Sequence, residues 1–242
     1  VVGGAQGVSV EGHDVTFLGR GGSDTTAVAL AHALGAQRCE LYTDVSGVFT
    51  SDPRVVPTAR KMERISFDEL LEMTAAGCPK PAMRSVEYAR THGVDLHVRS
   101  AFTWEPGTLV SKEDDDMEQA IISAVVHDID EAKVTIVGVE DRPGIAGTLF
   151  RALADAQVNV DVIVQNTSAE GHTDISFTVP HGDADTATRV SEELCERLGA
   201  RSVSTDRDIG RVSVVGAGMK THPGVAARVF ETLADNGINI EM

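Results

Sequence analysis

The sequence predicts an α/β domain in its first half and an α+β module, partly repeated, in its second half. In residues 1–111, short β-branched runs alternate with helical patterns, which is typical of a layered α/β domain. In residues 133–242, a strand, a Pro-Gly turn and a helical pattern occur twice in the same order, and such a repeat indicates a duplicated unit. A chain of 242 residues is long enough for two domains.

The first half contains the patterns of three helices. Glycines at 19–22 follow a strand-like run, and then Ser23 or Asp24 can cap a helix that ends at Gly35. Ser66 and Glu69 have the spacing of a capping box for a second helix. We expect a third helix at 83–92, a polar loop at 43–57, and short strands at 8–10, 15–18, 40–42 and 95–98.

The second half is organised by an internal repeat. Residues 141–162 align with residues 221–242 at an offset of 80, and eight of the 22 aligned positions are identical. The first helix presents Ile145, Leu149 and Leu153 on one face. We expect it to be followed by strands at 158–165 and 174–179, a helix at 184–198 and a strand at 201–205. This order predicts a ferredoxin-like module.

These patterns predict four consecutive parts. An α/β domain occupies residues 1–111, an acidic linker residues 112–132, a ferredoxin-like module residues 133–208, and the start of a second, truncated module residues 209–242. The chain opens at Val1 in strand-like sequence and stops at Met242 just after another strand-like run begins. We therefore expect it to be a piece of a longer protein.

Composition excludes several classes of function. The net charge is −16, and residues 112–242 alone carry 24 acidic against 11 basic groups, so neither nucleic acid nor an anionic membrane is expected as a partner. The three cysteines are odd in number and far apart, which argues against a disulfide framework and favours a cytoplasmic protein. The eight histidines have no metal-ligand spacing, so no metal-binding residue is assigned.

Two segments could carry chemistry. Residues 18–25 (LGRGGSDT) place glycines and Arg20 at a helix N-terminus, where backbone N–H groups and a guanidinium favour an anionic ligand. A tight turn with an N-cap explains the same residues equally well. Residues 43–54 follow a strand, and the carboxyl edge of a parallel sheet is a usual place for a nucleotide. Taken alone, this loop is more often a solvated surface segment.

In combination, these segments resemble aspartate kinase. The stretches LGRGGSDTTAVALA, TDVSGVFTSDPRVVP and RSVEYA, followed by two tandem Pro-Gly repeats, are similar to the actinobacterial type with concerted lysine-plus-threonine feedback, and the resemblance covers essentially the whole chain. It implies that residues 1–111 are the C-terminal part of an amino-acid-kinase domain, a three-layer α/β sandwich that is partial here. It also implies one ACT domain at 133–208 and part of another at 209–242.

The resemblance also implies roles for individual residues. Asp24 would be the catalytic residue that orients a lysine, and Arg20, Gly21, Gly22 and Ser23 would bind the substrate. The implied ATP-binding residues are Thr43, Asp44, Phe49, Thr50, Ser51, Asp52, Pro53, Arg54 and Lys80. The implied effector-binding residues are Asp141, Gly144, Ile145, Ala146, Asn159, Val160, Asp161, Val164, Gln165, Asn239 and Ile240.

The implied reaction is transfer of a phosphoryl group from ATP, with Mg²⁺, to the side-chain carboxylate of L-aspartate. It gives 4-phospho-L-aspartate, the first step toward diaminopimelate, lysine, threonine and methionine. A carboxylate with a reference pKa of about 3.9 needs no general base at neutral pH, so the task is to align two anions and neutralise their repulsion. Lysine and threonine would be effectors. The chain would join a homo-oligomer, or a catalytic and regulatory hetero-oligomer, through its ACT domains.

The sequence departs from the family in three places, and alternatives remain open. The Lys-Phe/Tyr-Gly-Gly stretch with the catalytic lysine is absent from the chain, so we expect this piece alone to be inactive. Gly4-Ala5 stands where the family has an aromatic residue, and Lys80 is one place later than the family's lysine, which would fall at Pro79. A non-catalytic regulatory subunit and a kinase for another amino acid, such as glutamate, are the competing hypotheses.

Overall fold

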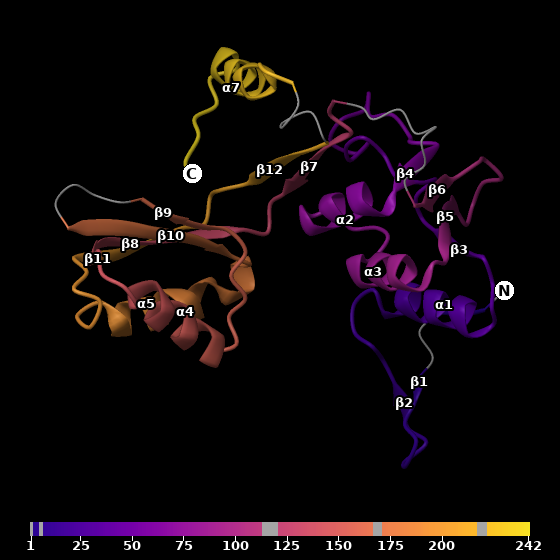
Figure 1. Ribbon diagram of the computed structural model, residues 1–242, viewed down its shortest axis with the longest axis horizontal. Coiled ribbons are helices and arrows are strands. Elements are labelled where there is room, and N and C mark those ends of the chain that lie inside the picture. The colour runs from indigo at the N-terminus through magenta and orange to yellow at the C-terminus, as the bar shows by residue number, and fades with distance from the viewer. Residues whose placement is uncertain (1, 5–6, 113–120, 167–170, 217–221) are drawn as a thin grey trace. The chain divides into compact units, whose positions relative to one another are not determined.

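The computed structural model describes residues 2–4, 7–112, 121–166, 171–216 and 222–242. They form two compact units, shown in Figure 1. Unit 1 consists of Val1–His127 and Val212–Asn236, and unit 2 of Asp128–Arg211 and Gly237–Met242. Each of two clusters of buried apolar residues forms a separate core. The mixed α/β fold class expected from the sequence is confirmed, because both units combine helices with sheets.

Unit 1 is built on a four-stranded sheet in the order β3-β5-β6-β4. Strands β3 (Arg38–Thr43) and β5 (Asp95–Ser100) are parallel, with Thr43 opposite Ser100. Strand β6 (Thr108–Ser111) runs antiparallel to β5 and parallel to β4 (Arg64–Ser66). Because β3 and β5 end at the same edge, the loops that follow both strands start side by side.

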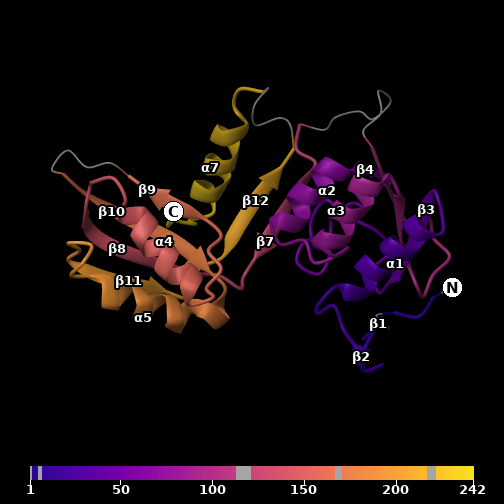
Figure 2. The same cartoon turned by 60° about the horizontal axis from the view of Figure 1, so that its bottom comes forward.

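Three helices cover one face of this sheet. They are α1 (Gly22–Ala33), α2 (Phe67–Ala75) and α3 (Met83–His92), which pack against one another and against the strands (Figure 2). Side chains alternate across a strand, so Leu41 is buried beneath the helices while its neighbour Tyr42 is half exposed on the opposite face. Of the expected three-layer sandwich, the described residues therefore supply a sheet and one helical layer.

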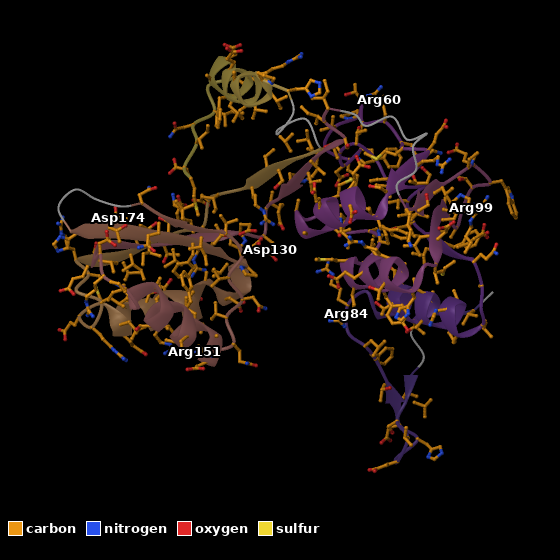
Figure 3. All side chains as sticks on the ribbon, in the orientation of Figure 1. Arg60, Arg84, Arg99, Asp130, Arg151 and Asp174 are labelled. Carbon is orange, nitrogen blue, oxygen red and sulfur yellow. The ribbon has the colours of Figure 1, made fainter. Side chains whose placement is uncertain are left out.

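The opposite face of the sheet is polar. The Arg99 guanidinium lies 5.7 Å from the centre of the Tyr42 ring, and its Nη1 is 3.3 Å from Glu40 Oε1 (Arg99 is labelled in Figure 3). The Tyr42 hydroxyl donates to Glu40 Oε2 at 2.9 Å. Hydrogen bonds from Tyr42 and Arg99 hold the pKa of Glu40 below its usual range. These contacts keep three polar side chains paired on a sheet face that carries no helix in the described part of unit 1.

In unit 1 the predicted capping box is confirmed, the predicted N-cap of α1 is wrong, and two expected strands are shorter than predicted. The capping box of α2 is present, since Ser66 Oγ accepts from Glu69 N at 3.2 Å and Glu69 Oε2 accepts from Ser66 N at 3.4 Å. Neither Ser23 nor Asp24 caps α1, because the helix begins at Gly22 with left-handed Gly21 (φ 73°) as its N-cap. Both residues lie in the first helical turn. The strands expected at 8–10 and 15–18 are shorter than predicted, because β1 (Gly7–Val8) and β2 (Val15–Thr16) have two residues each and pair as a hairpin.

A further strand pair joins the strand expected before the second copy of the repeat to a strand that the sequence did not predict. Strand β7 (Ala124–Asp128) pairs with β12 (Arg211–Val215). Ala124, Val126 and Val215 are buried in the core of unit 1. The range 112–132 that the sequence assigns to a linker therefore includes a strand. Residues 113–118 of its acidic run lie outside the described residues.

Unit 2 has the predicted ferredoxin-like topology. Its elements are β8 (Ala132–Glu140), α4 (Ile145–Asp155), β9 (Ile163–Gln165), β10 (His172–Val179), the short 3₁₀ helix His181–Asp183, α5 (Ala184–Leu194) and β11 (Ser202–Asp206). The sheet order is β11-β8-β10-β9 with antiparallel neighbours, and both helices lie on one face (Figures 1 and 2). The strand expected at 158–165 is shorter, because only Ile163–Gln165 forms a ladder with β10. The helix expected at 184–198 ends at Leu194.

The internal repeat is visible in the backbone itself. Gly144 before α4 and Gly224 before α7 (Val225–Asp235) are both left-handed N-caps, with φ of 93° and 97°. Two residues past the end of each helix the chain is left-handed again, at Gln157 (φ 61°) and Gly237 (φ 66°). The two copies thus share both turns at the predicted offset. Within the described ranges, none of the helices has the length and apolarity to cross a membrane.

The repeat predicts a stabilising substitution. Gln157 adopts a left-handed conformation in which its repeat partner is glycine, and a side chain there costs about 1–2 kcal/mol. We expect Gln157→Gly to raise the free energy of unfolding by about 0.5–1 kcal/mol, since greater freedom of the unfolded chain offsets part of the gain. Urea unfolding measures this difference. Gln157→Ala keeps the Cβ atom and serves as the control; equal stability of the two variants would contradict the explanation.

Candidate active site

Three segments of unit 1 meet around the short stretch that leads into α3. Cys78, Lys80 and Ala82 lie in this stretch, which we call the 78–82 segment. Its backbone contacts the first turn of α1 through Asp24, and its lysine contacts the loop after β3 through Asp44. The sequence places these segments far apart, and the fold brings together residues that the resemblance assigns to the substrate and to ATP.

Asp24 joins α1 to the 78–82 segment. Its Oδ2 accepts a hydrogen bond from the Ala82 amide at 3.0 Å, and Ala82 is the N-cap of α3. Beside it, a Cβ atom on Gly21 would lie 2.5 Å from the Ala82 Cβ. Close approach and a positive φ together require glycine at position 21. The carboxylate therefore fixes the start of one helix against the start of another.

Lys80 and Asp44 form an ion pair at the carboxyl edge of the sheet. The Lys80 ammonium bonds to Asp44 Oδ1, and this contact holds the pKa of Asp44 below its usual range. Both side chains are largely open to solvent, at 41% and 66% exposure, so the pair contributes little to stability. Thr43 Oγ1 accepts from Val45 N at 2.9 Å and shapes the turn that presents Asp44.

The loop from Phe49 to Arg54 is held by its neighbours. Thr50 N donates to the Arg60 carbonyl at 2.9 Å, and the Thr50 carbonyl accepts from Val125 N of β7 at 2.8 Å. Asp52 and Arg54 form a forked ion pair with distances of 2.7–3.2 Å. This pair lowers the pKa of Asp52, and it leaves the Arg54 side chain 81% exposed. An exposed guanidinium at a rigid loop can reach an incoming anion.

The remaining candidates for substrate and ATP binding differ in position. Gly22 is buried as the first residue of α1, whereas Arg20 and Ser23 are exposed beside it. Pro53 is exposed, and Ser51 is half-buried in the same loop as Asp52. The described contacts thus connect Asp24, Asp44 and Lys80 through the 78–82 segment. Arg20 lies just before α1 and takes no part in these two contacts.

The candidates for effector binding lie in unit 2. Gly144, Ile145 and Ala146 start α4, and Asp141 follows β8, with its amide bonded to the Gly171 carbonyl at 3.0 Å. The others form two exposed or half-buried stretches: Asn159, Val160, Asp161, Val164 and Gln165 before and within β9, and Asn239 and Ile240 near the end of the chain. Glu241 ties this last stretch to Lys133 of β8 at 3.3 Å.

Sequence reasoning missed three residues that organise these sites. Ala82 supplies the amide that positions Asp24. The buried Thr108 hydroxyl accepts from Val48 N at 2.8 Å and donates to the Met62 carbonyl at 2.6 Å, which fixes the base of the 49–54 loop. Arg211 pairs with Asp161. None of the three belongs to a local motif, because each acts across at least 46 residues of sequence.

Comparisons with known proteins find matches to both halves of the chain. The amino acid kinase family model matches residues 1–100, and an ACT domain model matches residues 134–193 and 212–242. The aspartokinase of Corynebacterium efficiens is 51% identical over 246 aligned residues, which cover 100% of this chain and 58% of that protein. The chain belongs to the aspartokinase family. It spans about 58% of the length of the curated relatives it matches.

Solved structures of aspartate kinases also match nearly the whole chain. Aspartate kinase from Synechocystis is 42% identical, with a TM-score of 0.52, over 96% of this chain and 42% of that one. Escherichia coli aspartokinase III in complex with aspartate and ADP is 29% identical, with a TM-score of 0.78, over 99% of this chain and 53% of that one. The same enzyme in complex with lysine and aspartate is 30% identical, with a TM-score of 0.72, over 99% and 52%.

The Asp24 contact predicts a measurable stability effect. Asp24→Ala leaves the Ala82 amide without its acceptor, and an unpaired amide that is partly buried costs about 1 kcal/mol or more. We expect urea unfolding to show this loss. Asp24→Asn keeps an oxygen acceptor and is the matched control, with a smaller loss. If both variants unfold like the wild type, the contact does not fix the two helices.

Proposed function

We propose that this chain is part of an aspartate kinase that phosphorylates the side-chain carboxylate of L-aspartate with ATP and works in the cytoplasm. The observation that carries the proposal is the 78–82 segment, which links Asp24 at the start of α1 to Asp44 at the end of β3. This arrangement places the two candidate binding segments around one edge of the sheet. The ADP and aspartate of E. coli aspartokinase III support it.

The residues suit a reaction between two anions. Arg20 and the first turn of α1 would hold the aspartate carboxylates, because N–H groups and a guanidinium stabilise negative charge there. The loop from Thr43 to Arg54 would hold the nucleotide, with Asp44, Asp52 and their paired cations beside the phosphates. Asp24 would orient the catalytic lysine that the family carries in sequence outside this chain. The acceptor carboxylate is already ionised at neutral pH.

Mg²⁺ would enter with the nucleotide, as part of the substrate MgATP. Within the described ranges, His, Cys, Asp and Glu side chains form no group of three that could hold a metal ion. Magnesium in kinases is usually bound by substrate phosphates, water and only one or two carboxylates, so this donor set fits. Asp44 and Asp52, which are acidic groups with lowered pKa values, are the candidates to complete the shell. The ion would neutralise charge on the phosphates.

The proposal predicts a specific kinetic defect. In a hydroxamate assay of the complete gene product with aspartate, ATP and Mg²⁺, we expect activity, and Arg20→Ala should raise the KM for aspartate about tenfold to a hundredfold through loss of a charged hydrogen bond. Arg38→Ala, at the opposite end of β3, is the matched control and should leave this KM unchanged. An inactive complete protein that still binds amino acids would instead support a regulatory subunit.

We also propose that lysine and threonine regulate the enzyme through its ACT domains. Gly144 opens α4, where an amino-acid carboxylate is favoured, and the exposed amides of Asn159 and Gln165 can bind polar groups. Strand β9 is the edge of its sheet and exposes Ile163 at 52%. An unpaired apolar edge suits pairing with another subunit, so an oligomer built through this edge would place effectors at an interface.

Gln165 tests the effector assignment. We expect Gln165→Ala to raise the effector concentrations for half-inhibition about two- to tenfold, because one polar contact to the ligand is lost. Inhibition curves with lysine and threonine, alone and together, measure the shift. Gln157→Ala removes the same side chain from the turn after α4 and serves as the control. Superimposable curves for both variants and the wild type would remove Gln165 from the effector site.

A further inference from the structure

One arginine of unit 2 serves three carboxylates. Arg211, the first residue of β12, bonds to Asp161 through Nη1 and lies 3.2 Å from Glu131 Oε1 through Nη2. The same Nη2 lies 3.6 Å from Asp128 Oδ2. The Arg211 side chain is 19% exposed and that of Glu131 only 5%. A single guanidinium therefore faces an excess of negative charge in a partly buried place, where each contact competes with the others.

The cluster lies where the chain enters and leaves the main segment of unit 2. Asp128 is its first residue and Arg211 its last. Asp128 Oδ1 also accepts from the amide of Asp130 at 2.9 Å, which shapes the turn before β8 (Asp130 is labelled in Figure 3). Asp128 and Arg211 also end β7 and begin β12, respectively. A change in the ion pairs of Arg211 would therefore alter the chain at both ends of this segment, Asp128 and Arg211, which we call the two connections of unit 2.

Asp161 presents its carboxylate from a fixed backbone. Its amide donates to the Thr178 carbonyl at 3.0 Å, which holds the residue against β10. The side chain is still 47% exposed, so a ligand can reach it. Asp161 also belongs to the residues that we propose for effector binding. Its carboxylate bonds to a cation of the chain itself, the guanidinium of Arg211.

Glu131 is an alternative ion-pair partner for Arg211. Burial raises the pKa of Glu131, and its Oε2 has no hydrogen-bond partner. A buried carboxylate with spare acceptor capacity attracts any cation that is released nearby. Asp128 is close on the same side of the guanidinium. Arg211 can thus lose Asp161 and keep two carboxylate partners.

We propose that Arg211 competes with a cationic amino-acid effector for Asp161. When the ammonium group of the effector pairs with Asp161, the Arg211 guanidinium loses that partner and pairs more closely with Asp128 and Glu131. This holds the two connections of unit 2, at Asp128 and Arg211, more firmly together. The proposal rests on the proposed regulatory function and adds to it the residue that converts effector binding into a change at the connections. It makes Arg211 a positioning residue that lowers effector affinity and yet is needed for inhibition.

The test separates binding from inhibition in the complete gene product. Arg211→Met combined with Glu131→Gln removes the competing cation without leaving a buried carboxylate unpaired. We expect calorimetry to show lysine binding about fivefold tighter, the gain from one lost competing ion pair. We also expect lysine with threonine to inhibit this variant at least about threefold less than the wild type, when the inhibition of each protein is expressed relative to its own uninhibited rate. Tighter binding with weaker inhibition is a result that simple loss of structure does not produce.

Two further variants keep the result interpretable. Arg211→Lys retains one charge for Glu131 but cannot form a fork to two carboxylates, so it should shift both readouts in the same directions and needs no second substitution. Arg189→Met, which breaks only the exposed pair with Glu193 on α5, is the control and should change neither.

Different failures have different meanings. Lysine binding that is unchanged or weaker in both Arg211 variants would overturn the competition. Tighter binding with full inhibition would overturn the role of Arg211 at the connections. Wild-type protein with kinase activity but no lysine binding would contradict the proposed regulation itself, and the inference would be lost with it.

Discussion

The parallel pairing of β3 with β5 is the constraint on which the candidate active site depends. Because Thr43 and Ser100 lie opposite each other, the loop that carries Asp44 leaves the sheet at a defined edge. The helices on one face then place the start of α1 and the start of α3 near that edge, and the 78–82 segment joins them. The contacts at the site are weak individually, since most are exposed to solvent. Their geometry comes from the buried core beneath, where Leu96, Val98 and Val86 are fully inaccessible.

Unit 2 depends on a different constraint, the pairing of β8 with β10 in the centre of its sheet. Ile136 and Ile175 face each other in this ladder and are fully buried beneath α4 and α5. The Gly138 amide donates to Asp174 Oδ1 at 2.7 Å where the ladder shifts register (Asp174 is labelled in Figure 3). The irregularity in the strand therefore leaves this amide with a hydrogen-bond acceptor. This central ladder supports the loop around Asp161 on one side, through the Thr178 carbonyl, and the edge strand β9 that pairs with β10.

Local patterns in the sequence predicted the elements that local forces determine. The capping box at Ser66 and the apolar face of α4 each depend on residues within one or two helical turns, and both are present. The repeat predicted α7 and the Pro-Gly turn before it from α4. Strands β4 and β6, with three and four residues, carry too short a pattern to be recognised, and they exist because the sheet provides partners. The N-cap of α1 was mispredicted because left-handed Gly21 replaces the side-chain caps that Ser23 and Asp24 offered.

The sites were predictable as residue types but not as contacts. Resemblance to the family named Asp24, Asp44 and Asp161, while their partners Ala82, Lys80 and Arg211 lie 58, 36 and 50 positions away in the sequence. No spacing rule links such pairs, because the fold alone brings them together. Lys80 shows the difference most clearly. It stands one place later than the family's lysine, and it still reaches Asp44 from the 78–82 segment.

The most direct test of the account is a crystal structure of the complete gene product with MgADP and aspartate. The account predicts the nucleotide phosphates beside the loop from Thr43 to Arg54, the aspartate carboxylates at Arg20 and Ser23, and the 78–82 segment between the two ligands. Nucleotide bound away from the carboxyl edge of β3 and β5, or aspartate bound without contact to α1, would contradict it.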